Sequence, residues 1–301
     1  MIKRMKLKAY GKINLGLDVL RKREDGYHEV KMVMQTVGLY DIIDLRATEQ
    51  KGIRVETNLY YLPSDRNNLV WKAAEMLMSE FDLPGGLDIS LKKMIPVAAG
   101  MAGGSSDAAA VLYGVNRMFH LGLSLEELKV RGVKIGADVP YCLMRGTALS
   151  EGIGEILTPL PPVPQCWVLL AKPKISVSTK WVYSSLHANE LRPEDHPDID
   201  GLVDAIRRGD LRGMAGKFGN VLELVTEKRY PIIEEIKDEM KRHGALNAMM
   251  SGSGPTVFGL FEDARAAKKA YWTLKKGRLS GGIRQVYLTN FFNNREVSNG
   301  L

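Results

Sequence analysis

The chain has 301 residues, of which 45% are hydrophobic and 26% are charged, an ordinary composition for a globular protein. This length allows two domains of ordinary size or one large one. No apolar run reaches the roughly 18 residues that a membrane-spanning helix needs, and the basic N-terminus lacks the apolar core of a signal peptide. We therefore expect a cytoplasmic protein without a membrane partner.

Charge and cysteine content narrow the possible ligands. The formal net charge of +7 favours attraction of phosphorylated small molecules and, less specifically, of nucleic acid. No basic stripe with interleaved aromatic residues supports nucleic-acid binding, so none is expected. The two cysteines, Cys142 and Cys166, are too few for a disulfide framework or a cysteine zinc site. Both are expected to pack as small apolar groups.

The first half is predicted to combine strands with a few helices. Residues 6–19 alternate apolar and polar side chains around a break at Gly11, and Asp25-Gly26 predicts a turn. Asn67 or Asn68 is expected to cap a helix. The other predicted elements, in chain order, are strands over 30–37, 42–46 and 87–91, helices over 108–118 and 124–134, and a short apolar strand that follows the segment GADVPYC.

A domain boundary is predicted near residue 160, where glycines and a proline cluster follow residue 147. We expect an N-terminal domain over 1–160 and a C-terminal domain over 161–301. The tail after Asn293 is polar and expected to be loose. The predicted elements of the second half are strands over 167–171, 245–249, 256–261 and 285–288, and helices over 180–186, 202–207, 211–218, 232–243 and 264–274.

The central stretch covers residues 95–115 and reads IPVAAGMAGGSSDAAAVLYGV. Its glycines let the backbone approach a ligand closely, and the helix that follows exposes amides that attract anions. Ser105 or Ser106 could add a hydroxyl to a phosphate oxygen or to Mg²⁺. A flexible turn before a capped helix is the alternative. A Walker loop is excluded because no lysine follows Gly104.

Three further segments carry groups suited to phosphoryl transfer. Asp138 lies in a turn from which its carboxylate could accept a hydroxyl proton; alone, it would be read as an Asx turn or a cap. Lys12 could stabilise charge beside that carboxylate, although a lone strand lysine is usually solvated. The turn SGSGP after Met250 could approach the loop, or could form only a tight β-hairpin.

The run PVAAGMAGGSSDAAA resembles the phosphate loop of the galacto-, homoserine, mevalonate and phosphomevalonate (GHMP) kinases. Met101 replaces a common leucine, which keeps size and apolarity. Because K-x-N, G-A-D-V-P and SGSGP also match, the resemblance covers residues 8–288. It implies a two-domain α+β fold, with an N-terminal domain of a type first found in a ribosomal protein and a ferredoxin-like C-terminal domain. It also implies ATP and Mg²⁺ as cofactors.

The resemblance also implies the site residues. The catalytic pair of the family falls on Lys12 and Asp138. Mg²⁺ is expected to arrive with ATP, with Ser105 or Ser106 as the hydroxyl beside it. The loop residues implied to bind ATP are Pro96, Val97, Ala98, Ala99, Gly100, Met101, Ala102, Gly103, Gly104, Ser105 and Ser106.

The segments K-I-N-L-x-L-x-V and D-G-Y-H resemble one branch of these kinases, which acts on cytidine-diphosphate-linked methylerythritol in the methylerythritol phosphate route to isoprenoids. This implies phosphorylation of the 2-hydroxyl and substrate-binding roles for Asn14, Tyr27, His28 and Tyr183. An aromatic ring stacked on a base contributes about 1–3 kcal/mol in single-strand binders. Outside this pattern, Tyr27 would be read as a half-buried strand residue and His28 as a surface one.

Two rival functions stay open at this point. Another GHMP kinase would phosphorylate homoserine or mevalonate, and a non-enzymatic nucleotide-binding or RNA-binding protein would give Lys12 and Asp138 no role. Residues 58–68 are expected near adenine from their position alone. A monomer or a weak homodimer is expected.

Overall fold

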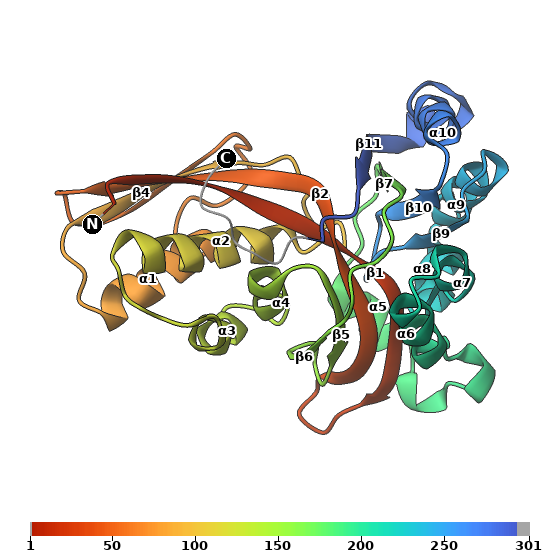
Figure 1. Cartoon of the computed structure of the whole chain (residues 1–301), viewed down its shortest axis with the longest axis horizontal. Helices are drawn as coiled ribbons and strands as arrows, with labels where there is room; N and C mark the ends of the chain where they lie inside the picture. The colour runs from red at the N-terminus through yellow and green to blue at the C-terminus, as the bar shows by residue number, and fades with distance from the viewer. Residues whose placement is uncertain (1, 294–301) are drawn as a thin grey trace.

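The computed structural model describes residues 2–293, whose strands form a seven-stranded sheet and a four-stranded sheet (Figure 1). The first sheet has the order β3-β4-β2-β1-β8, with β5 pairing to β2 and β6; the second has the order β11-β7-β10-β9. The strands of the first sheet are β1 (Arg4–Lys22), β2 (His28–Thr48), β3 (Gly52–Thr57), β4 (Gly86–Lys92), β5 (Thr147–Glu151), β6 (Ile156–Pro159) and β8 (Gly219–Asn220). Those of the second are β7 (Trp167–Pro173), β9 (Asn247–Met250), β10 (Val257–Phe261) and β11 (Ile283–Asn290).

Helices cover one face of the first sheet and the outer side of the second. In Figure 1, α1 and α2 lie beneath β4, β2 and β1, and α9 and α10 lie outside β9, β10 and β11. The helices are α1 (Leu69–Glu80), α2 (Gly103–Met118), α3 (Leu125–Val133), α4 (Val139–Met144), α5 (Thr179–Ser185), α6 (Ile199–Arg207), α7 (Leu211–Gly216), α8 (Glu223–Arg229), α9 (Ile232–Arg242) and α10 (Ala264–Lys276). This arrangement confirms the α+β class.

The hairpin of β1 and β2 is the longest element pair and reaches both halves of the molecule (Figure 1). The two strands are joined at the predicted Asp25-Gly26 turn. Their antiparallel register shifts between Tyr10 and Lys12 and again between Asn14 and Gly16. Such bulges bend a strand and redirect its side chains. The two bulges therefore lie on either side of Lys12 and Asn14, the two residues of the K-x-N motif on β1.

The predicted helix caps are confirmed. The Asn68 side chain accepts a hydrogen bond from the Val70 amide at 3.1 Å, so Asn68 caps α1. Ser124 and Glu127 form a capping box at the start of α3, in which each side chain bonds the other residue's backbone amide. Both cysteines are buried, as expected.

Several predicted elements were wrong. The residues after Asp138 form helix α4 rather than a strand, because an apolar run that is buried on every side has no periodicity to separate the two. The predicted boundary region after residue 147 forms strands β5 and β6, and α2 begins at Gly103 rather than at residue 108. Strand β3 and helix α8 were not predicted.

The last strand of the first half, β6, ends at Pro159, and β7 of the second sheet begins at Trp167. The division into domains near residue 160 stays a prediction, since β8 returns from the second half to pair with β1. Among the described residues no helix is both long and apolar enough to cross a bilayer. The expectation of a loose tail after Asn293 lies outside the described residues.

Candidate active site

A cavity of about 990 Å³ lies where the two halves of the chain meet. It brings together segments that are far apart in the sequence, because the hairpin of β1 and β2 passes beside both the glycine-rich loop and the second sheet. Its lining includes Lys12, Asn14, Tyr27 and His28, residues 96–100 and 102–105 of the loop and the start of α2, Asp138, Thr179, Lys180, Tyr183 and residues 252–254. The predicted segments therefore share one site.

The glycine-rich loop, residues 95–102, packs against the turn of the second sheet. Ala98, Gly100 and Ala102 all have positive φ, of 50°, 71° and 52°. The Ser251 hydroxyl donates to the Gly100 carbonyl at 2.9 Å, which joins the loop to the SGSGP turn. The N-cap of α2, Ala102, has no side chain that could cap the helix. The first amides of this helix are thus oriented for an anionic ligand.

Two loop residues predicted to bind ATP do not line the cavity. Met101 is 1% exposed and packs in the core, while its carbonyl accepts the Lys12 amide at 3.1 Å. Ser106 is buried, and its hydroxyl donates to the Tyr10 carbonyl. Neither side chain lines the cavity, and the predicted part of both residues in binding ATP stays a prediction. Ser105 lines the cavity and is the hydroxyl that faces a ligand there.

Lys12, Asn14 and Asp138 form a polar cluster in the lining of the cavity. Lys12 Nζ donates to Asn14 Oδ1 at 2.7 Å and lies 3.9 Å from Asp138 Oδ2. The lysine side chain is 6% exposed, whereas that of Asp138 is 31% exposed. Lys12 and Asn14 are both buried beside the carboxylate, unlike a lone strand lysine, which is usually solvated. A buried ammonium can stabilise negative charge more strongly than a solvated one.

Three rings lie at another part of the same cavity. The ring centroids of His28 and Tyr183 are 5.1 Å apart, with 50° between their planes, and Tyr27 is 60% exposed. Burial lowers the pKa of the His28 imidazole and raises that of the Tyr183 hydroxyl. The imidazole is thus neutral at pH 7 and has one donor and one acceptor nitrogen. These groups can enclose a flat heterocycle and bond its edge.

Other residues of the lining carried no signal in the sequence. Lys22 and Lys93 line the cavity together with Lys180, but isolated lysines in a basic chain indicate only solvated surface. In the segment expected near adenine, the lining includes Leu62, Pro63, Asn67 and Asn68. Within residues 2–293, no three His, Cys, Asp or Glu side chains form a group that could hold a metal ion.

Replacing Gly100 by alanine is expected to weaken ATP binding by about tenfold or more. The added Cβ would collide with the Ser251 carbonyl, and φ of +71° disfavours any side chain. The left-handed backbone alone costs about 1–2 kcal/mol. Gly122→Ala is the matched control, since its φ is +74° and nothing lies within 4 Å of the added carbon. Calorimetric titration with ATP compares the two; equal affinities would show that the loop need not contact the SGSGP turn.

The comparison with protein families agrees with this geometry. The model of the GHMP kinases N terminal domain matches residues 68–146, which include the loop, α2 and Asp138. The model of the GHMP kinases C terminal matches residues 202–277, which include the SGSGP turn. Both matched ranges contribute residues to the lining of the cavity.

Relatives match over nearly the full chain. A 4-diphosphocytidyl-2-C-methyl-D-erythritol kinase of Lachnoclostridium phytofermentans is 54% identical over 291 residues, which cover 97% of this chain and 98% of the relative. An enzyme of that name from Geobacillus kaustophilus is 50% identical, with 97% and 98% covered.

Solved structures also match. A crystal structure of 4-(cytidine 5'-diphospho)-2C-methyl-D-erythritol kinase has a TM-score of 0.79 at 31% identity and covers 95% of this chain and 99% of that one. A homoserine kinase from Cytophaga hutchinsonii has the same TM-score at 21% identity, with 99% and 97% covered, which shows a shared fold. The chain belongs to the 4-diphosphocytidyl-2-C-methyl-D-erythritol kinases, a branch of the GHMP kinase family.

Proposed function

We propose that the chain transfers the γ-phosphoryl group of ATP to the 2-hydroxyl of 4-diphosphocytidyl-2-C-methyl-D-erythritol, giving the 2-phosphate and ADP, in the methylerythritol phosphate pathway. The names of relatives up to 54% identical support the reaction. The observation that carries the proposal is one cavity that joins the glycine-rich loop, the Lys12–Asn14–Asp138 cluster and the rings of Tyr27, His28 and Tyr183. Both substrates therefore reach one cluster of polar groups.

Asp138 acts as the general base in this proposal. Its partly exposed carboxylate accepts the proton of the acceptor hydroxyl as that oxygen attacks phosphorus. Lys12 Nζ, 3.9 Å from the carboxylate, stabilises the charge that develops on the attacking oxygen. Asn14 Oδ1 holds the lysine ammonium in place by its 2.7 Å hydrogen bond. A tertiary hydroxyl is hindered, so placement contributes as much as basicity.

The phosphates of ATP are held by the loop and by the start of α2. Amides of the first turn bind phosphate oxygens, because no side chain caps them and the helix dipole favours negative charge there. Mg²⁺ supplies charge neutralisation on the phosphates when it is bound, as in other phosphoryl transfers. Ser105 is the hydroxyl on the cavity side of the loop, where it can contact a phosphate or the ion.

Replacing Tyr27 by alanine is expected to raise KM for the cytidine substrate by about tenfold, because a stacked ring contributes about 1–3 kcal/mol. KM for ATP should change by less than about twofold, since ATP occupies the loop at another part of the cavity. Trp272→Ala, an aromatic residue 51% exposed on α10, is the control. Steady-state kinetics with each substrate varied gives the comparison. Equal changes in both KM values would contradict this role of Tyr27.

The reaction is tested by measuring ADP release with Mg-ATP and one acceptor at a time: the cytidine substrate, homoserine, mevalonate, or none. Release that depends on the cytidine substrate alone supports the proposal. Preference for homoserine or mevalonate would overturn the acceptor assignment. ATP binding without release for any acceptor would favour a nucleotide-binding protein that is not a kinase.

A further inference from the structure

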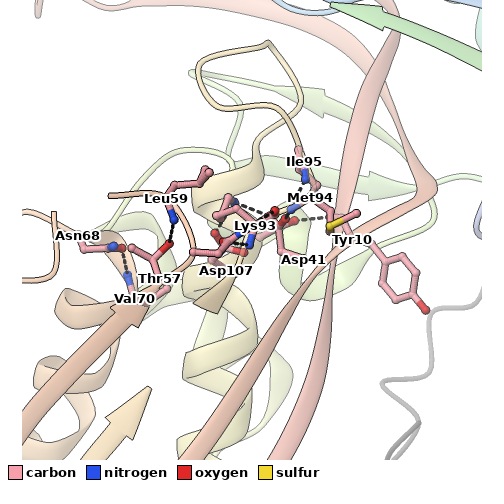
Figure 2. Close-up of polar contacts among 12 residues, drawn as sticks. Tyr10, Asp41, Thr57, Leu59, Asn68, Val70, Lys93, Met94, Ile95 and Asp107 are labelled. Atoms are coloured by element: carbon pink, nitrogen blue, oxygen red, sulfur yellow. Dashed lines mark hydrogen bonds and ion pairs between the residues drawn. The ribbon is translucent and has the colours of Figure 1, made fainter. Parts of the chain in front are cut away.

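Lys93 lies between the buried carboxylates of Asp41 and Asp107, just before the glycine-rich loop in the chain (Figure 2). It follows the last residue of β4, and its Nζ donates to Asp41 Oδ2 on β2 and, at 2.6 Å, to Asp107 Oδ2 on α2. Its side chain is 4% exposed, and those of Asp41 and Asp107 are 0% and 3% exposed. One ammonium thus joins a strand and a helix inside the protein.

The first carboxylate also fixes the start of the loop. Asp41 Oδ1 accepts the amide of Met94 and, at 2.8 Å, that of Ile95, the residue before Pro96. The Asn58 side chain bonds both backbone groups of Lys93, accepting from its amide at 2.8 Å and donating to its carbonyl at 3.2 Å. The backbone that enters the loop is therefore held at three successive residues.

The second carboxylate lies where the loop ends. Asp107 is in the second turn of α2, which begins at Gly103, and a Cβ added to Gly103 would lie 3.2 Å from Lys93 Nζ. Among the described residues Asp107 Oδ1 has no hydrogen-bond partner. Burial raises the pKa of the Asp107 carboxyl, while the neighbouring Lys93 ammonium acts in the opposite direction. The lysine is thus the group that ties this carboxylate in place.

We propose that Lys93, Asp41 and Asp107 are positioning residues that clamp the two ends of the glycine-rich loop, so that its amides and those of α2 point at the phosphates of ATP. The inference rests on the proposed binding of ATP at this loop. A buried ion triad adds little net stability compared with apolar residues of similar size, so its main effect here is to fix the distance between β2, the loop and α2. Lys93 and Asp107 also belong to the cavity lining, but their side chains are only 4% and 3% exposed and are engaged with each other, so the three residues act mainly through the loop backbone.

The test compares substitutions of Asp107. Asp107→Ala removes the link between Lys93 and α2, and we expect the Kd for ATP to rise and kcat to fall, each by about tenfold, since small displacements of a binding loop are costly. Asp107→Asn keeps an oxygen that can accept from Lys93, and should restore both values to within about threefold of wild type. Asp107→Leu keeps the volume without an acceptor and serves if the alanine variant does not fold; it should behave like Asp107→Ala in ATP binding.

A matched control is available in the second half of the chain. Lys237 Nζ also bonds two carboxylates, Glu223 at 3.0 Å and Glu227 at 2.5 Å, and Glu227 does not line the cavity. Glu227→Ala should lower the melting temperature and leave the ATP Kd unchanged. Calorimetric titration with ATP and thermal unfolding are measured for every variant.

The possible results distinguish a failure of the positioning role from a failure of the proposed function. Loss of ATP affinity in the alanine or leucine variant, with recovery in Asp107→Asn, supports positioning. Unchanged ATP affinity and kcat in both variants, with a melting temperature lowered as in Glu227→Ala, would overturn it and leave a purely structural triad. Absence of ATP binding by the wild-type protein would overturn the proposed function itself and this inference with it.

Discussion

Replacing Asp138 by asparagine is expected to lower kcat by about 10²–10⁴-fold, the usual contribution of a general base. The amide has the shape of the carboxylate but cannot take the proton of the acceptor hydroxyl. ATP affinity should stay within about twofold of wild type, because the phosphates contact the loop and not Asp138. Single-turnover phosphoryl transfer with saturating ATP and cytidine substrate measures the chemical step, and calorimetric titration measures ATP binding.

Asp204→Asn on α6 is a suitable control for this variant. Its side chain is 59% exposed, pairs with Arg207 on the same helix at 3.4 Å, and is not part of the cavity lining. It should leave turnover unchanged. If Asp138→Asn retained more than about a tenth of the wild-type rate, the carboxylate would be a binding group and another acceptor of the proton would be needed.

Features set by neighbouring residues could be predicted from the sequence. The caps at Asn68 and Ser124 depend on side chains that bond amides two or three residues further along, so the sequence contains both partners. The glycine-rich loop was also predicted from neighbouring residues, whereas the roles of Lys12 and Asp138 were implied by the resemblance to one family. Their common cavity could be expected only because the segments resemble one family.

Features set by long-range pairing could not be predicted. The Lys93 triad exists because β2 and β4 pair, with Ile42 opposite Lys92, and because α2 packs beneath them. In the sequence, Lys93 is one of many lysines, and Asp107 is one more polar residue near the start of a predicted helix. No local pattern indicates that they meet.

The sequence also could not show which of the two adjacent serines, Ser105 or Ser106, faces the cavity. Ser105 faces the cavity and Ser106 faces Tyr10, because the helix already begins at Gly103. That start follows the left-handed conformation of Ala102, which is not a glycine and so gives no sign of positive φ in the sequence. A shift of one residue on a helix turns the side chain by about 100° and exchanges the two roles.

Replacing Lys12 by methionine is expected to lower kcat by about 10²–10³-fold, the cost of removing one group that stabilises charge in a transition state. Methionine keeps the length and apolar stem of the side chain, so the buried position on β1 stays filled. Both KM values should change by less than about threefold if the ammonium acts mainly on the attacking oxygen. Lys6→Met, an exposed position on the same strand, is the control and should keep full activity.

The double variant Lys12→Met with Asp138→Asn distinguishes a catalytic pair from two independent groups. The two side chains lie 3.9 Å apart, so their effects should not add: the double variant should be little slower than Asp138→Asn alone. Without a base to remove the proton, little negative charge develops on the acceptor oxygen for the ammonium to stabilise. Fully multiplicative rate losses would mean that Lys12 acts on the transferred phosphoryl group instead, independently of the proton transfer to Asp138.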